Sequence, residues 1–271
     1  MNGRRRIVLI RGALFQFVLV AVAAVFYFLV RGITEGGEDR AIRHARSILR
    51  FERILGLDVE AGVQDVVLRW RPLVTAANWV YMWGHWPVIS VALLALYLRD
   101  RKNYVLLRNA MFLSGAVGLF IFALWPVAPP RLLPEGAGYV DTVTIWSDSY
   151  RILQPPALVN KYAAMPSFHV GWNLLVGFMI WKTFRNPAAR VLAVAGPASM
   201  AAAVVATANH FVLDSVVGIA IALAGLAASY RVYEFTSRRG VDLAHIQLVG
   251  PGHSRLHGKS STARLEEAEV S

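Results

Sequence analysis

Long runs of apolar residues are the feature that most constrains how this chain can fold. One run extends from Ala13 to Val30, and comparable runs recur along the sequence, so that 56% of the 271 residues are hydrophobic. A helix of about 20 apolar residues spans the hydrocarbon core of a bilayer. Such a helix also satisfies its own backbone hydrogen bonds where no water is available. The chain is therefore predicted to be an all-α membrane protein.

Six transmembrane helices are expected, and together they would form a bundle. They cover approximately residues 13–30, 72–98, 104–125, 167–181, 191–207 and 211–230. The first run follows a cluster of arginines and could be a signal peptide. No clear small-residue cleavage site follows it, so an uncleaved span is favoured. The third span stops at Pro126, because proline cannot continue a helix.

The segment between the first two spans is charged, with an apolar stripe at helical spacing. The stripe consists of Ala41, Ile42, Ala45, Ile48, Leu49 and Leu55. This pattern predicts an amphipathic helix that lies in the membrane interface, with packing over the spans as the alternative. The chain then divides into an N-terminal anchor and amphipathic region (1–71), a core (72–230) and a polar tail (231–271) that we expect to be disordered.

The composition excludes several classes of protein and of site. Without cysteine, the chain has no disulfide framework, no thiolate metal site and no cysteine nucleophile. The net charge of +11 comes from basic residues that cluster beside the apolar runs, which favours membrane lipids over nucleic acid as partners. No nucleotide-binding or calcium-binding motif is present, so no cofactor is expected. No protein partner can be inferred.

The basic residues also indicate an orientation. Six spans put both termini on one side of the membrane. If that side is the cytoplasm, the inside segments hold 14 Lys or Arg and the outside loops hold 11, of which eight lie in the first loop. The count favours a multi-pass plasma-membrane protein with cytoplasmic termini, although the first loop argues against it. The loops before the fourth and sixth spans then share the extracytoplasmic face, where we expect the active site.

His210 and Asp214 are the first candidates for chemistry. Their i, i+4 spacing places them on one helix face. A carboxylate one turn away can accept an imidazole N–H, which fixes the tautomer and leaves the other ring nitrogen as a nucleophile. An acid inside an apolar helix is costly, so a catalytic pair is favoured over a structural ion pair.

The tetrad Pro166-Ser167-Phe168-His169 opens the expected fourth span. Free N–H groups and a serine hydroxyl at a helix start form a ready anion site, so Ser167 is predicted to help bind an anion. His169 lies just inside the helix and is predicted to act as the general acid for the leaving group. Alone, the tetrad could equally be a capped helix with an incidental histidine.

Three further residues complete the predicted site. Arg131 follows two prolines that rigidify its loop, and its guanidinium suits a tetrahedral oxyanion. Interfacial snorkelling is the alternative for this arginine. Tyr81 and His85 share one face of the expected second span, where interhelical hydrogen bonding is favoured and a substrate pocket is the alternative. The set fits phosphoryl transfer without a metal, because no third strong ligand has a metal-like spacing.

At these residues the chain resembles the type 2 phosphatidic acid phosphatase superfamily. The superfamily has a six-helix core and three motifs: one basic, one of the form Pro-Ser-x-His, and one ending in His-x-x-x-Asp. Here they look like the region around Arg131, residues 166–169 and the segment from His210 to Asp214. The resemblance covers roughly residues 72–230.

The resemblance implies a role for each matching residue. His210 would attack phosphorus, and Asp214 would orient its ring. His169 would protonate the leaving alkoxide, while Arg131 and Ser167 would hold phosphate oxygens.

Several positions depart from the phosphatase pattern. Phe168 stands where the tetrad usually has glycine, Ala203 and Val204 replace a Ser-Arg pair, and Leu124 replaces a lysine. Two familiar phosphate-binding cations are therefore missing. In this respect the chain is similar to the branch of inositol phosphorylceramide synthases and related bacterial proteins, which tolerates a bulky third residue and lacks the Ser-Arg pair.

The leading hypothesis is an integral-membrane enzyme that transfers a phosphoryl group from a lipid phosphate or phosphodiester through a phosphohistidine. Water as the acceptor would make it a lipid phosphatase, and a polyol or lipid hydroxyl would make it an inositol-phosphotransferase-like enzyme. The alternative is a catalytically inactive lipid-binding or scaffolding protein of the same fold. A transporter ranks lower, because the polar residues cluster at one face instead of forming a path across the membrane.

Overall fold

The computed structural model describes residues 3–134, 137–146 and 160–239 of the chain. These residues form α-helices and one short 3-10 helix, η1 (Pro130–Leu132), and no β-strand occurs among them. One isolated bridge pairs Val127 with Ala163. The all-α class predicted from the apolar runs is confirmed.

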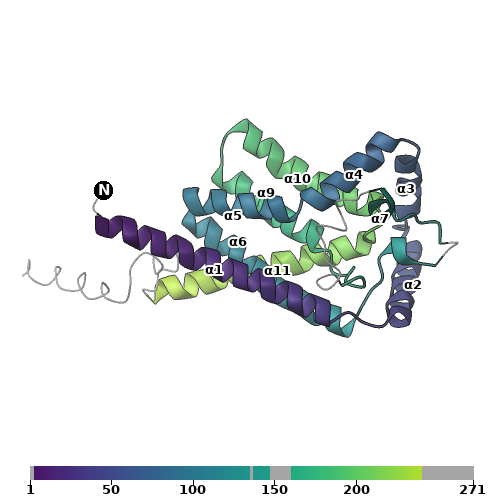
Figure 1. The fold of residues 1–271 in the computed structure, drawn as a ribbon, viewed down its shortest axis with the longest axis horizontal. Helices are drawn as coiled ribbons and strands as arrows, with labels where there is room; N and C mark the ends of the chain where they lie inside the picture. The colour runs from purple at the N-terminus through teal and green to yellow at the C-terminus, as the bar shows by residue number, and fades with distance from the viewer. Residues whose placement is uncertain (1–2, 135–136, 147–159, 240–271) are drawn as a thin grey trace, which may run out of the picture.

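Long helices run alongside one another and form the body of the molecule (Figure 1). They are α1 (Gly3–Ile33), α5 (Trp86–Arg99), α6 (Arg101–Leu124), α9 (Phe168–Thr183), α10 (Pro187–Ala206) and α11 (Val212–Arg238). At one end lie α2 (Glu38–Leu55), α3 (Glu60–Leu68) and α7 (Thr142–Trp146), and α4 (Arg71–Trp83) leads from that end to α5. The start of α1 and the end of α11 lie at the opposite end.

Four of the described helices are long and apolar enough to cross a membrane: α1, α6, α10 and α11. The pair α4 and α5 meets the same criterion together, bent by 49°, and would make a fifth crossing. α9 has 16 residues, which at 1.5 Å per residue corresponds to about 24 Å. A hydrocarbon core is about 30 Å thick. Of the six predicted spans, four or five therefore meet the criterion.

The second predicted span, residues 72–98, is broken in the structure. α4 ends at Trp83 and α5 begins at Trp86, with Pro87 in its first turn. Pro87 has no N–H to donate to the carbonyl of Trp83, and its ring would clash with that carbonyl in a continuous helix. The break places His85 between the two helices instead of on the face of one straight span.

α11 continues beyond the predicted end of the sixth span. It runs to Arg238, so residues 231–238, which were assigned to the polar tail, are helical. The packing explains the extension, because Tyr230 and Tyr233 lie against the main core cluster and the Lys182 ammonium donates a 2.6 Å hydrogen bond to the Tyr230 hydroxyl. The predicted disorder of the remaining tail lies outside the described residues.

The apolar face of α2 packs on the protein. Ala41, Ala45 and Ile48 are buried in one cluster with residues of the loops that follow α6 and precede α9. His44 stacks on Trp125, with ring centroids 3.9 Å apart. The buried part of this face therefore packs on the protein, as the alternative to an interfacial position predicts, while Leu55 at the end of the stripe is 51% exposed.

Two glycines bring α9 directly onto α11. A Cβ on Gly171 of α9 would overlap the carbonyl of Gly218, and a Cβ on Gly218 of α11 would overlap the carbonyl of Ser167. Because neither residue has a side chain, the first turn of α9 rests on the backbone of α11. This crossing carries His169 towards His210.

Candidate active site

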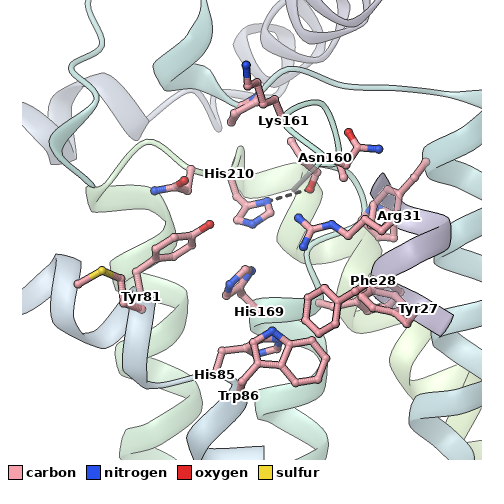
Figure 2. Close-up of a pocket in the computed structure, with 18 of the residues that line it drawn as sticks. Tyr27, Phe28, Arg31, Tyr81, His85, Trp86, Asn160, Lys161, His169 and His210 are labelled. Atoms are coloured by element: carbon pink, nitrogen blue, oxygen red, sulfur yellow. Dashed lines mark hydrogen bonds between the residues drawn. The ribbon is translucent and has the colours of Figure 1, made fainter. Parts of the chain in front are cut away.

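A cavity of about 320 Å³ lies where the end of α1, the α4–α5 break, the start of α9 and the turn before α11 meet (Figure 2). Five of the predicted site residues line it: Tyr81, His85, Arg131, His169 and His210. The three motifs, which are far apart in the sequence, therefore contribute to a single cavity.

A tight turn between α10 and α11 positions His210. The Ala208 N–H donates to the Val205 carbonyl at 2.9 Å, and the Asn209 N–H donates to the Val204 carbonyl at 3.0 Å, which is the Schellman pattern of a helix C-terminus. Ala208 has φ 51°, the left-handed conformation that this pattern requires. His210 consequently lies on a hydrogen-bonded turn, two residues before α11 begins.

The imidazole of His210 is held by a backbone carbonyl. Its Nδ1 lies 2.8 Å from the carbonyl oxygen of Ala164. A carbonyl can only accept, so Nδ1 carries the proton and donates, which leaves Nε2 with a free lone pair. The residue is 5% exposed and lines the cavity. The site thus presents one defined tautomer of a potential nucleophile.

Asp214 supports His210 less directly than the i, i+4 spacing predicts. Its Oδ2 lies 3.5 Å from His210 Nδ1 and accepts a 2.9 Å hydrogen bond from the Phe211 N–H. Asp214 is the third residue of α11, so its carboxylate reaches back to cap the helix that carries it. The expected primary acceptor of the imidazole proton is therefore replaced by the Ala164 carbonyl, with the carboxylate as a more distant, charged neighbour.

Two glutamates outside the predicted site hold the same helix end. Glu52 accepts a 2.7 Å hydrogen bond from the Leu213 N–H, and Glu60 accepts a 2.8 Å bond from the Val212 N–H. Both side chains are fully buried. Burial, followed by the nearby Glu60 carboxylate, raises the pKa of Glu52 to about 8 against the lowering effect of the Leu213 N–H. The sequence signal was present, because Glu52 follows Ile48 at helical spacing on the apolar face.

His169 is held by ring packing. Its imidazole stacks on Tyr81, with centroids 4.6 Å apart, and packs against His85 at 4.4 Å. The Nδ1 atom of His85 lies 3.2 Å from the side-chain amide nitrogen of Asn173. The His169 and His210 centroids are 5.5 Å apart. Figure 2 shows the His169 ring between His210 and His85.

Phe168, the bulky third residue of the tetrad, occupies a notch in α6. Its ring lies where a Cβ on Gly118 would be, stacks on Trp172 at 4.7 Å and meets Phe122 edge-on at 6.2 Å. The side chain is 4% exposed. Phenylalanine is therefore accommodated here because α6 has a glycine opposite it.

Ser167 has a different environment from the one predicted. It precedes the first residue of α9, it is fully buried, and its hydroxyl has no hydrogen-bond partner among the described residues. Its N–H donates to the Asp214 carbonyl at 2.9 Å. The side chain is not among those that line the cavity. The backbone of Ser167 thus binds α11. The position of its hydroxyl gives no support to the predicted contact with phosphate, because the side chain does not line the cavity.

Arg131 links the first motif to the third. Its Nε donates to Asn209 Oδ1 at 2.8 Å, and its Nη1 forms an ion pair with Asp141 Oδ2 at 2.6 Å. Its N–H donates to the Ala208 carbonyl at 2.9 Å. Part of the guanidinium is therefore committed to holding the turn that carries His210, while the residue still lines the cavity.

The cavity also contains residues outside the predicted site. Arg31 of α1 and Asn160, Lys161 and Asn209 of the loops line it, and no aspartate or glutamate in the described part of the chain does. Arg31 comes directly after the first apolar run, where an arginine is ordinarily a flanking charge, so only the packing of α1 identifies it. Among the described residues no group of three His, Cys, Asp or Glu side chains could hold a metal ion.

Comparison with known families supports the resemblance seen in the motifs. A family model described as the PAP2 superfamily matches residues 46–228, which is more than half of the chain. The matched segment begins within α2 and ends within α11, and it includes Arg131, His169, His210 and Asp214 but not α1. No curated protein and no solved structure matches the chain.

Proposed function

Because the chain belongs to the PAP2 superfamily, whose members are generally phosphatases and phosphotransferases, we propose that it is a membrane-embedded enzyme that transfers a phosphoryl group from a lipid phosphate or phosphodiester. His210 is the nucleophile and His169 is the general acid and base. The observation that carries the proposal is the pair of imidazoles in one cavity, with the proton of His210 directed to the Ala164 carbonyl and its Nε2 lone pair available.

The first half of the reaction cleaves the substrate. Nε2 of His210 attacks phosphorus, a P–N bond forms, and the P–O bond to the lipid alcohol breaks. Protonated His169 gives its proton to the departing alkoxide, so no free alkoxide is released. The negative Asp214, 3.5 Å from Nδ1, stabilises the positive charge that the ring acquires.

The second half regenerates the enzyme. Water or an alcohol attacks the phosphohistidine, neutral His169 takes the proton of the attacking hydroxyl, and the P–N electron pair returns to Nε2. With water, a lipid phosphate yields inorganic phosphate and a phosphodiester yields its headgroup phosphate, whereas a polyol yields a new phosphate ester. The bulky Phe168 and the absence of the Ser-Arg pair at Ala203 and Val204 favour the inositol-phosphotransferase-like branch for the second outcome.

The membrane arrangement follows from the same proposal. α9 would be a sixth, short crossing beside the four or five apolar ones, with both termini in the cytoplasm and the cavity on the extracytoplasmic side of the plasma membrane. In support, the start of α1 and the end of α11 lie opposite α2 and α3 in the fold (Figure 1). The basic residues of the short loops agree with this orientation.

Label transfer tests the proposal. Purified wild type and His210→Ala are incubated in detergent with a phosphate-labelled phospholipid, with and without inositol. Label released by the wild type alone, as inorganic phosphate or as the phosphate of the substrate's own headgroup, indicates a hydrolase. Label in a new lipid, or in inositol phosphate only when inositol is added, indicates a transferase. His44→Gln, which changes a histidine outside the cavity, is the matched control and keeps activity. An unchanged substrate with every protein favours the catalytically inactive lipid-binding or scaffolding alternative.

A further inference from the structure

We propose that Arg31, in the last turn of α1, binds the phosphate group of the substrate in the cavity. The inference rests on the proposed function, because it takes the anion that enters the cavity to be the phosphate of a lipid. It assigns to the first helix, which lies outside the matched family segment, a direct part in substrate binding.

The charge of the cavity favours an anion. Among the described residues, three cations line it, namely Arg31, Arg131 and Lys161, together with three histidines, and no acidic side chain does. Of the three cations, Arg131 already donates to Asn209 and Asp141. Lys161 is exposed at the rim.

Arg31 has an unsatisfied donor inside the protein. Its Nε is buried without a hydrogen-bond partner, and no carboxylate lies within ion-pair distance of its guanidinium among the described residues. Leaving such a donor unpaired is costly, and a charged one more so. Figure 2 shows the guanidinium reaching from α1 into the cavity, towards His210 and His169. A tetrahedral oxyanion at His210 would supply the acceptors that the protein does not.

Aromatic packing fixes the end of α1 in this position. Tyr27 lies 5.7 Å from Trp172, and Phe28 lies 5.0 Å from Trp86, measured between ring centroids. Tyr27 is one helical turn before Arg31 on the same face of α1. Its contact with Trp172 therefore also fixes the position of the Arg31 guanidinium along the helix axis. Glu35, four residues on, accepts a hydrogen bond from the Lys161 N–H at 3.4 Å. These contacts hold the end of α1 in one position, whereas an arginine that only extends to the membrane interface does not require a fixed position.

The positions where the superfamily's phosphate-binding cations were expected hold uncharged residues, so positive charge for the phosphate has to come from elsewhere in the protein. Ala203 and Val204, which stand where the Ser-Arg pair was expected, are 3% and 0% exposed and lie in an apolar cluster. Leu124, in place of the expected lysine, is 59% exposed at the end of α6. None of these three residues carries a charge, whereas Arg31 enters the cavity from another helix. A guanidinium, with its fork of donors, can bind two phosphate oxygens at once.

Orthovanadate, a tetrahedral phosphate analogue, tests the assignment without requiring turnover. Its apparent Kd is measured from the shift in thermal unfolding of the full-length protein in detergent. Arg31→Gln is expected to weaken binding at least about tenfold, because a charged hydrogen-bond donor is lost. Arg31→Lys keeps the charge without the fork and is expected to fall in between. Arg11→Gln, which removes an exposed cation from the same helix, leaves the Kd unchanged.

Two results would overturn the inference: an Arg31→Gln protein that binds orthovanadate as the wild type does, or a wild type that binds none. If Arg31→Gln does not fold, Arg31→Lys decides, since a Kd equal to that of the wild type excludes a role for the guanidinium fork. Turnover of labelled phospholipid by the wild type is measured in parallel. Orthovanadate binding that depends on Arg31, in a protein that cleaves no lipid phosphate, would reject the proposed function and leave the anion site in place.

Discussion

His210 and His169 occupy the same cavity but are held in different ways. His210 is fixed by polar contacts, with its Nδ1 on the Ala164 carbonyl and its helix end capped by buried carboxylates. His169 is fixed by ring packing against Tyr81 and His85. A nucleophile benefits from one defined tautomer, whereas an acid and base must exist in both charge states. The difference in support therefore matches the difference in the proposed roles.

The largest expected effect is the loss of kcat/KM on replacing each histidine, and its dependence on the leaving group of the substrate distinguishes the two. His210→Asn is expected to lower kcat/KM by at least about 10³-fold with any phosphate ester, because the nucleophile is gone. His169→Asn is expected to lower it about 10²- to 10⁴-fold with a lipid phosphate. With an aryl phosphate, whose leaving group needs no protonation, the loss at His169 should be much smaller. Equal losses with both substrates would mean that His169 does not act as the general acid.

The second effect asks which group orients His210. Asp214→Asn removes the charge but leaves the Ala164 carbonyl as the acceptor of the Nδ1 proton, so we expect a loss of about 100-fold, below that of the His210 variant. Steady-state rates with the labelled phospholipid provide the measurement. A loss as large as that of His210→Asn would show that the carboxylate, and not the carbonyl, determines the tautomer.

The third effect concerns the opposite charge states that the two rings must hold. His210 must be neutral to attack, so the rate should fall as the pH is lowered, and His169 must be protonated to act as an acid, so the rate should fall as the pH is raised. A bell-shaped profile of kcat/KM against pH is therefore expected. A flat profile would contradict the pairing of roles.

The fourth effect probes the packing on the side of His169. Gly118→Ala places a methyl group where the Phe168 ring lies and is expected to destabilise the protein by about 1–3 kcal/mol through overpacking. Gly37→Ala, at a glycine with no atom within 4 Å of the added Cβ, is the control. Thermal unfolding in detergent measures both. An unchanged midpoint for Gly118→Ala would show that the ring moves freely and does not help to seat α9.

The smallest effect concerns the carboxylates on the side of His210. Because the pKa of Glu52 is raised to about 8, the folded protein holds more protons than the unfolded chain between about pH 4.5 and 8. The stabilisation from this group is therefore complete below that window and decreases as the pH rises through it. Glu52→Gln keeps an oxygen for the Leu213 N–H and removes the titration.

The unfolding midpoint of Glu52→Gln should accordingly fall less than that of the wild type between pH 5 and 8. Asp65→Asn, which changes an exposed carboxylate on α3, should keep the response of the wild type. The same decrease for Glu52→Gln and the wild type would show that Glu52 is not the group that titrates.

The sequence alone determined the all-α class and the segments that contain the proposed catalytic residues. Apolar runs are a local property, because a chain that must satisfy its backbone in lipid has few options besides a helix. Motif spacing is equally local, and it identified His169, His210 and Asp214. The helix break after Trp83 was also encoded locally, by Pro87. The sequence nevertheless predicted one continuous span, because the apolar run extends across the break.

The tertiary structure alone decided which groups complete the site. The acceptor of the His210 proton is a backbone carbonyl, which every residue has and no sequence pattern marks. Arg31 becomes a cavity residue only because Tyr27 and Phe28 seat α1 against α5 and α9. Contacts of this kind join residues many positions apart, and they depend on how rigid helices pack and not on the spacing of residues within any one of them.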